Sequence, residues 1–447
     1  MPAPPSPSPP HLVWHRRLAP LALVLAALLA WSNSFSGPFV FDDLSAILAN
    51  PTLENFRTAL SPPRDGGTVS GRPIVNLSFA LNRAIGGTEV WSYHAFNLAI
   101  HILAGLTLFG LVRRTLARTR FAPHALSLAF SATLLWLLHP LTTSAVTYVV
   151  QRAESLMALS FLLTLYAFAR STETKCHLLN DTSLGGPPQK CHLIDDTFPR
   201  RFSAPWLIVS LLACLAGMAC KEVMAVAPLV VLLYDRTFVA GTFRAALRLR
   251  WPYYSALAAT WLLLAALVLA NSGRAGTASL GKISFDYALT QSAAIVRYLG
   301  LAFWPQPLVF DYGTPLAASV LAVWPQFALL LALLGLAVAT LRRAPAAGFL
   351  FAAFSLILAP SSSFVAITTQ TIAEHRMYLP LTAVAVAATF VLHAVFKTRA
   401  LGVALLLALA LGVATAHRNG TYRTALALWS DTAVKRPDNA RAHNELA

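Results

Sequence analysis

Two adjacent carboxylates, Asp42 and Asp43, directly follow the first long hydrophobic run of the chain, in the stretch SGPFVFDD. Acids are scarce in this protein, with 18 acidic against 34 basic residues, so a pair at the end of a membrane segment is unusual. Ionisable groups at a membrane boundary are costly and usually serve function. One carboxylate could act as a general base on a hydroxyl group, and two together could hold a divalent cation.

Further ionisable side chains are expected near the same face of the membrane. They are Arg72, His139, Arg152, Glu154, Lys221, Glu222, Asp311, Glu374, His375 and Arg376. Arginine and lysine can bind a phosphate and stabilise it as a leaving group. A carboxylate beside a cationic phosphate site suits sugar transfer from a lipid-phosphate donor whose tail stays in the bilayer. Each residue alone could be a loop cap or an interface anchor, so the hypothesis depends on their gathering at one face.

The composition predicts a membrane protein. Hydrophobic residues make up 57% of the chain and charged residues 12%, whereas a soluble domain is about 25% charged. Apolar runs of about 15 to 20 residues recur, and each could span or nearly span a bilayer as a helix. The net charge of +16 could indicate nucleic-acid binding, but the bases lie mostly in short loops between the runs, which is typical of topology signals. We therefore expect a bilayer and no nucleic acid as partner.

These runs predict an all-α polytopic protein with about 11 transmembrane helices. The predicted spans cover residues 18–35, 94–112, 123–138, 155–169, 204–219, 222–234, 252–271, 323–341, 346–360, 377–395 and 400–416. With this count the arginine-rich loops share one side, which places the N-terminus in the cytoplasm. The tail 1–17 is Pro-rich and cytoplasmic, and 18–416 forms the transmembrane domain. The large loops 36–93 and 272–322 are then external, and we expect 289–304 to be re-entrant or interfacial, or else a helical pair that crosses and returns.

Two other segments stand out. KCHLLNDT at 175–182 returns as KCHLIDDT at 190–197, but adjacent Cys and His point in different directions and no CxxC spacing occurs, so we favour a duplicated loop over a zinc site. In 417–447, Ala425, Trp429 and Ala433 share a helix face before Pro437, which resembles the start of a tetratricopeptide repeat array.

The motifs together resemble a known family. FVFDD after the first span is similar to the acidic motif of the GT-C superfamily of glycosyltransferases that use polyprenyl-phosphate sugars. The closest branch is the TMTC family, in which a GT-C region precedes tetratricopeptide repeats. The stretches that carry this resemblance are GRPIVNLSFALN, HAFNLAIHIL, LLHPLTTSAVTYVVQRAESLMAL, GMACKEVMAVAPLVVLLYD, RYLGLAFWPQPLVFDYG and EHRMYLP.

The resemblance implies a GT-C-like bundle that transfers a hexose, typically mannose, from a polyprenyl phosphate to a protein Ser or Thr. Asp42 or Asp43 would be the catalytic base, with Asp43 slightly preferred. Residues expected to bind the donor phosphate are Arg152, Lys221, His375 and Arg376, and residues expected to support them are Arg72, His139, Glu154, Glu222 and Glu374. No metal and no cofactor is predicted, although the acid pair leaves a divalent metal open.

Two other functions are compatible with such a chain. A transporter or lipid flippase would place charges near the membrane midplane on interrupted helices and often shows inverted repeats, which the sequence lacks. A non-catalytic scaffold would act through the repeats alone. Loop charges give sidedness but not the compartment; the composition, rich in Ala, Leu and Arg, favours a bacterial inner membrane with a periplasmic active face over the endoplasmic reticulum. The sugar, the acceptor and the oligomeric state are left open.

Overall fold

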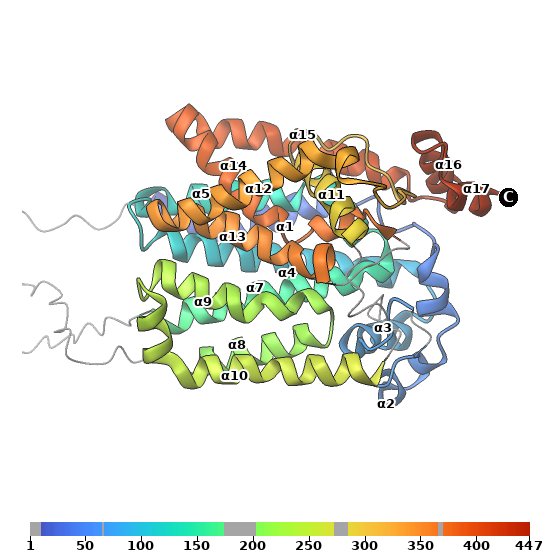
Figure 1. The fold of residues 1–447 in the computed structure, drawn as a ribbon, viewed down its shortest axis with the longest axis horizontal. Helices are drawn as coiled ribbons and strands as arrows, with labels where there is room; N and C mark the ends of the chain where they lie inside the picture. The colour runs from blue at the N-terminus through green and yellow to red at the C-terminus, as the bar shows by residue number, and fades with distance from the viewer. Residues whose placement is uncertain (1–9, 65–66, 174–202, 272–284, 365–369) are drawn as a thin grey trace, which may run out of the picture.

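A computed structural model describes residues 10–64, 67–173, 203–271, 285–364 and 370–447. Their regular structure is helical throughout, with no strand among them, and seventeen α-helices are joined by short 3₁₀ and π turns (Figure 1). The duplicated Cys-His segments at 175–182 and 190–197 lie outside the described residues. The α-helices are α1 (Pro10–Ala30), α2 (Phe56–Ala59), α3 (Pro73–Gly86), α4 (Val90–Leu116), α5 (Ala125–Leu137), α6 (Thr143–Val146), α7 (Arg152–Ser171), α8 (Ala204–Met218), α9 (Ala227–Phe238), α10 (Phe243–Ala270), α11 (Phe285–Phe303), α12 (Val320–Arg343), α13 (Pro345–Ala359), α14 (Leu381–Phe396), α15 (Ala400–Gly420), α16 (Ala425–Lys435) and α17 (Ala440–Leu446).

Every apolar run predicted to span the membrane falls on one of these helices, but the count of about 11 crossings is not confirmed. Among the described residues, six helices are long and apolar enough to cross a membrane, or seven if the bent pair Ala122–Leu137 and Pro140–Val146 is one span. The longest of them, Leu381–Gly420, is broken at Lys397, whose φ of 49° separates α14 from α15. Two apolar helices, Leu18–Ala30 and Ala204–Met218, are shorter. The protein is thus an integral multi-pass membrane protein.

The segment predicted to be re-entrant forms one continuous helix, α11, rather than a helical pair. Its 19 residues carry Asp286 and Arg297, and α11 is not among the helices apolar enough to span. One face of α11 is buried, with Tyr287 and Tyr298 inside, so the helix packs onto the bundle.

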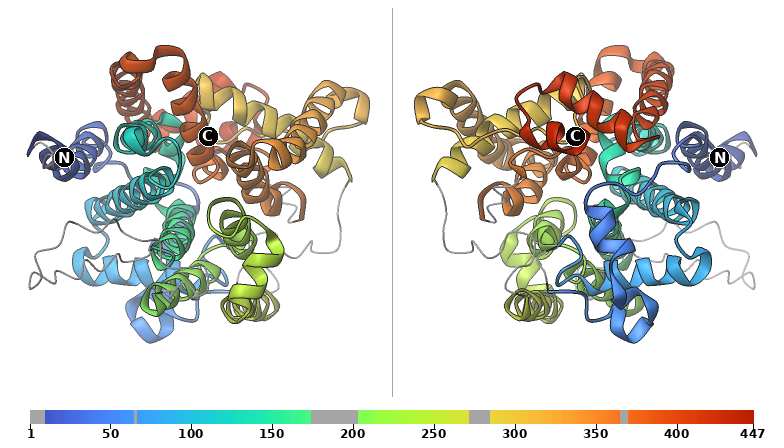
Figure 2. Two further views of the ribbon diagram at one scale, coloured as in Figure 1. Left: turned by 90° about the vertical axis from the view of Figure 1, so that its left-hand side faces the viewer. Right: turned by 90° about the vertical axis from the view of Figure 1, so that its right-hand side faces the viewer.

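The long helices run roughly side by side, and several of the shorter helices lie at one end of the bundle. Figure 1 shows α2, α3, α16 and α17 at this end, together with the C-terminus, and Figure 2 shows the helices end-on. We call it the loop end. That the predicted external connections share one face of the membrane stays a prediction.

A buried aromatic cluster fixes the elements that position the loop end. Trp31, at the end of α1, donates its indole N–H to the Leu137 carbonyl at 3.2 Å. Trp136 of α5 donates to the Tyr378 carbonyl at 2.8 Å, and His101 of α4 lies 2.8 Å from the Tyr378 hydroxyl. Because buried polar groups must be hydrogen-bonded, these contacts define where the chain leaves α1 and where it enters α14.

The C-terminal helices α16 and α17 form a helix–turn–helix with Pro437 in the turn, as the repeat hypothesis requires of its first helices. They pack on the loop end: the Trp429 ring lies 5.1 Å from that of Phe310, and Lys435 donates to the Leu308 carbonyl at 2.9 Å. Whether they begin a tetratricopeptide array stays a prediction.

Candidate active site at the loop end

Asp42 lies in the turn between α1 and a π-helical segment, Leu44–Leu48, and is half-buried. Phe41 before it has a φ of 49°, a left-handed conformation that turns the chain sharply at this point. One Asp42 carboxylate oxygen accepts from the Thr68 hydroxyl at 3.0 Å, and the Asp42 backbone N–H donates to the Tyr148 hydroxyl at 3.1 Å. Burial raises the pKa of Asp42, while Thr68, Tyr148, Arg441 and Arg72 act in the opposite direction.

Asp43 has a different environment, although it is the next residue. It is fully buried, and its two oxygens accept from the backbone N–H groups of Val40 at 3.0 Å and Val150 at 2.7 Å. Burial raises the pKa of Asp43 to about 8, opposed by these two hydrogen bonds. The carboxylate therefore ties the turn after α1 to the loop before α7. The slight preference for Asp43 as base is not supported by this geometry, which leaves Asp42 as the acid open to a reactant.

Two buried ion pairs lie close to each other, and one of them is linked to Asp42. Arg72, at the start of α3, contacts Glu222 at 3.2 Å and donates to the Thr68 carbonyl at 2.6 Å. Lys221 forms an ion pair with Glu154 of α7. Burial lowers the pKa of Lys221, the carboxylate of Glu154 raises it, and the charge of Arg72 lowers it again. The two pairs are thus close enough to influence each other, and Thr68 connects Arg72 to Asp42.

His375 and Arg376 lie in the 3₁₀ turn Glu374–Met377 and complete this cluster. Burial, followed by the charges of Lys221, Arg376 and Arg72, lowers the pKa of His375 well below its ordinary value. The ring is therefore neutral near pH 7, and its predicted contact with a donor phosphate would be a hydrogen bond rather than an ion pair.

Arg376 is a buried cation held by neutral oxygens. Its guanidinium donates to the carbonyls of Gln370 at 2.6 Å and Thr371 at 3.0 Å. Among the residues that the structure describes, no carboxylate lies within ion-pair distance of it, unlike Arg72 and Lys221. A cation of this kind attracts an anionic ligand, since its charge is not neutralised by a nearby acid.

Three further predicted site residues lie outside this cluster. Arg152 is fully buried and its donors are occupied by oxygens of Ser78, Asn82, Tyr93 and Asn97. The ring nitrogens of His139 contact the Leu141 N–H and the Ala302 carbonyl, both at 3.1 Å.

Glu374 contacts the loop after α11. It accepts from the Val309 N–H at 2.5 Å and the Tyr312 hydroxyl at 2.9 Å, so it anchors the loop after α11. Arg152, His139 and Glu374 therefore have structural surroundings rather than a place beside Asp42. Arg152 in particular does not reach a donor phosphate with any unoccupied nitrogen.

The sequence reasoning missed three neighbours of Asp42. Thr68, Tyr148 and Arg441 are separated from it by 26, 106 and almost 400 residues, so no local pattern connects them to the acidic motif. Only the fold brings them together. As for metals, no group of three or more His, Cys, Asp or Glu gathers at metal-binding distance in the part of the chain that the structure describes.

No family model matches the chain. Protein O-mannosyl-transferase TMTC1 of Homo sapiens is 30% identical over 221 residues, which are 47% of this chain and 22% of that protein. Tmtc1 of Drosophila melanogaster is 27% identical over 343 residues, which are 69% and 36% of the two chains, and TMTC2 of Mus musculus is 34% identical over 173 residues, which are 35% and 19%. The chain thus spans well under half the length of these relatives.

Two solved structures are also similar. ArnT from Cupriavidus metallidurans, bound to undecaprenyl phosphate, has 15% identity and a TM-score of 0.44, with 92% of this chain and 69% of that one covered. An Archaeoglobus fulgidus oligosaccharyltransferase has 13% identity, the same TM-score, and coverage of 97% and 60%.

The relatives named above are animal proteins, so they give no support to the preference for a bacterial membrane. Their shared name matches the family that the quoted motifs indicate. The chain is a sequence relative of the TMTC protein O-mannosyl-transferases.

Proposed function

We propose that this protein is a membrane glycosyltransferase that moves a hexose such as mannose from a polyprenyl-phosphate-linked donor to a Ser or Thr hydroxyl of a protein, at the external face of the membrane. The observation that carries the proposal is that Thr68 links the half-buried Asp42 carboxylate to Arg72, whose charge acts on His375 together with those of Lys221 and Arg376. The similarity to protein O-mannosyl-transferases supports it. The loop end would be the external face, because the charge pattern of the sequence places the short arginine-rich loops on the cytoplasmic side.

The reaction would be a single displacement. Asp42 accepts the proton of the acceptor hydroxyl as its oxygen bonds to the anomeric carbon of the sugar. The bond from that carbon to the phosphate oxygen breaks, and the electron pair leaves with the polyprenyl phosphate. Attack opposite the leaving group inverts the anomeric configuration, so the product differs from the donor in its anomer.

The cations would stabilise the departing phosphate. Arg376 lacks a carboxylate partner among the described residues and would bind the phosphate most directly, while Glu222 and Glu154 hold Arg72 and Lys221 in place. Neutral His375 could donate a hydrogen bond to a phosphate oxygen. Because these groups are buried, their charges act in a low-dielectric site where they are worth more than in water.

A transfer assay tests the proposal. The purified protein, reconstituted in nanodiscs, is incubated with radiolabelled polyprenyl-phosphate mannose and a Thr-containing peptide, and the product anomer is determined by NMR. Labelled peptide with inverted configuration is expected. Retention of configuration would exclude the single displacement. Complete absence of transfer, with partner proteins still recruited through α16 and α17, would favour the scaffold function, and movement of the lipid across the bilayer without transfer would favour a flippase.

Arg376→Gln is expected to raise the KM for the polyprenyl-phosphate donor by about 10- to 100-fold, the range for a lost charge-assisted contact of about 1.5–3 kcal/mol. Glutamine keeps a donor for the Gln370 or Thr371 carbonyl but removes the charge. The measurement is the dependence of rate on donor concentration at a saturating peptide concentration. Arg57→Gln is the control, since Arg57 is exposed on α2. An unchanged donor KM together with a reduced yield of folded protein would show that Arg376 is purely structural.

Thr68→Val is expected to move the acid limb of the kcat/KM profile to higher pH by about half to one pH unit, the equivalent of one ordinary hydrogen bond. The Thr68 hydroxyl donates to Asp42 and lowers its pKa, so removing it raises that pKa. A base works only when ionised, and the rate therefore recovers at higher pH. Thr58→Val in the same loop, whose hydroxyl contacts only backbone carbonyls, should leave the profile unchanged. A matching shift in the Thr58 variant would mean that Asp42 is not the titrating group.

A further inference from the structure

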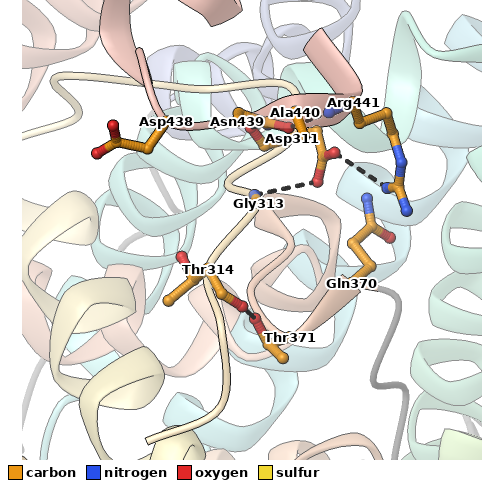
Figure 3. Close-up of a pocket in the computed structure, with 9 residues that line it drawn as sticks. All are labelled: Asp311, Gly313, Thr314, Gln370, Thr371, Asp438, Asn439, Ala440 and Arg441. Carbon is orange, nitrogen blue, oxygen red and sulfur yellow. Dashed lines mark hydrogen bonds and ion pairs between the residues drawn. The ribbon is translucent and has the colours of Figure 1, made fainter. Parts of the chain in front are cut away.

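A polar cleft of about 350 Å³ lies between the C-terminal helices and the membrane domain (Figure 3). Three segments line it: the loop after α11 with Asp311, Gly313 and Thr314, the residues before the Glu374 turn with Gln370 and Thr371, and the turn into α17 from Asp438 to Arg441. We call it the junction cleft. Its volume falls in the range of about 300–1,000 Å³ that is typical of ligand pockets.

Contacts between the two sides fix the shape of the junction cleft. Arg441 forms an ion pair with Asp311 at 3.0 Å, and the Asn439 side-chain amide donates to the Asp311 carbonyl at 2.9 Å. Gly313 has a φ of +54°, and a Cβ at this position would lie 2.7 Å from the Asn439 side chain. The close approach of α17 to this loop therefore requires glycine. The start of α17 and the turn before it therefore form one wall of the cleft.

The junction cleft borders both halves of the candidate active site. The Arg441 guanidinium lies 5.3 Å from the centre of the Phe41 ring, directly before Asp42, and its charge acts on the Asp42 carboxylate. On the other side, the backbone carbonyls of Gln370 and Thr371 hold Arg376. A molecule in the cleft would therefore lie next to the proposed base and the proposed phosphate site at once.

The lining indicates what kind of molecule fits. Its polar groups are amides, hydroxyls, carboxylates and the Arg441 guanidinium, and such groups can form hydrogen bonds with the N–H and C=O groups of an extended main chain. The nearby aromatic rings of Tyr312 and Trp429 are 3% and 2% exposed, so they offer no face on which a sugar acceptor could stack. A lipid tail would find no apolar wall among the lining residues.

We propose that the junction cleft is the acceptor subsite, where an extended polypeptide lies between α17 and the Asp311 loop and presents a Ser or Thr hydroxyl to Asp42. The inference rests on the proposed function and adds to it the place and the form in which the acceptor binds. It makes the first C-terminal helices part of the catalytic unit, since one wall of the subsite comes from α17.

Ala440→Trp tests the subsite. Ala440 is exposed on the cleft side at the start of α17 and its side chain makes no polar contact, so tryptophan fills the cleft without removing a hydrogen bond. We expect the KM for a ten-residue Thr-containing peptide to rise at least about tenfold, with donor hydrolysis by water unchanged. Val434→Trp is the matched control, because Val434 is 80% exposed on α16 and does not line the cleft. It should leave both rates unaltered.

Peptide binding is measured in parallel, by fluorescence anisotropy with the full chain in nanodiscs, so that the two proposals can fail separately. If sugar transfer is active and Ala440→Trp changes neither KM nor anisotropy, the subsite is wrong while the transferase function stands. If no sugar is transferred but the peptide still binds and Ala440→Trp abolishes binding, the subsite stands and the transferase function is wrong. Binding of an oligosaccharide instead of the peptide, blocked by the same substitution, would overturn the polypeptide subsite.

Discussion

Asp42→Asn should lower sugar transfer by about 10²- to 10⁴-fold, the usual contribution of a general base, while the protein still folds. Asparagine has the size of aspartate and can accept from the Thr68 hydroxyl with its remaining oxygen, but it cannot take a proton. The carboxylate is half-buried, so the substitution removes a charge without opening a cavity. The measurement is kcat for transfer from labelled donor to peptide, with folding checked by thermal unfolding in the same detergent.

Asp43→Asn is the matched control, because it makes the same chemical change one residue away. Both oxygens of Asp43 accept from backbone N–H groups, and an asparagine NH₂ would face one of those donors. An unsatisfied buried donor costs about 1–3 kcal/mol, so this variant should lose stability while its folded fraction keeps activity within about tenfold. The reverse pattern, an active Asp42 variant and a folded but inactive Asp43 variant, would restore the assignment that the sequence alone suggested.

The comparison of these two acids shows where sequence reasoning stops. The apolar runs predicted the helices well, because a helix buried in lipid needs an uninterrupted apolar sequence and little else. The acidic motif stood out in the sequence because acids are rare in such a chain. The choice between Asp42 and Asp43 depends on whether Val150, more than 100 residues away, donates to one of them, and no local pattern contains that information.

The candidate phosphate-binding residues also could not be ranked from the sequence. The sequence offered Arg152, Lys221, His375 and Arg376 together as candidate ligands of a donor phosphate. Their surroundings differ: Lys221 pairs with Glu154, His375 lies among three cations and is neutral, and Arg376 donates to two carbonyls and the Tyr287 hydroxyl. Only tertiary contacts decide which of these side chains stays available to a ligand.

Arg152→Gln should destabilise the protein by about 3–5 kcal/mol, the cost of breaking a buried charged network. The guanidinium makes five hydrogen bonds to four residues of α3 and α4, and its centre lies 4.4 Å from the Phe79 ring and 4.7 Å from the Phe96 ring. It therefore joins α7 to both helices. Glutamine reaches at most two of these acceptors and leaves the remaining oxygens without a donor.

Arg152→Lys should destabilise the protein nearly as much, because a lysine ammonium cannot reproduce the planar arrangement of the five guanidinium N–H donors. The measurement is the free energy or the midpoint of unfolding in detergent, with Arg57→Gln as a control expected to stay within about 0.5 kcal/mol. The donor KM of the folded fraction separates the two interpretations of Arg152. A structural residue leaves that KM unchanged, whereas a stably folded Arg152→Lys protein with a raised donor KM would return Arg152 to the phosphate site and contradict the network seen here.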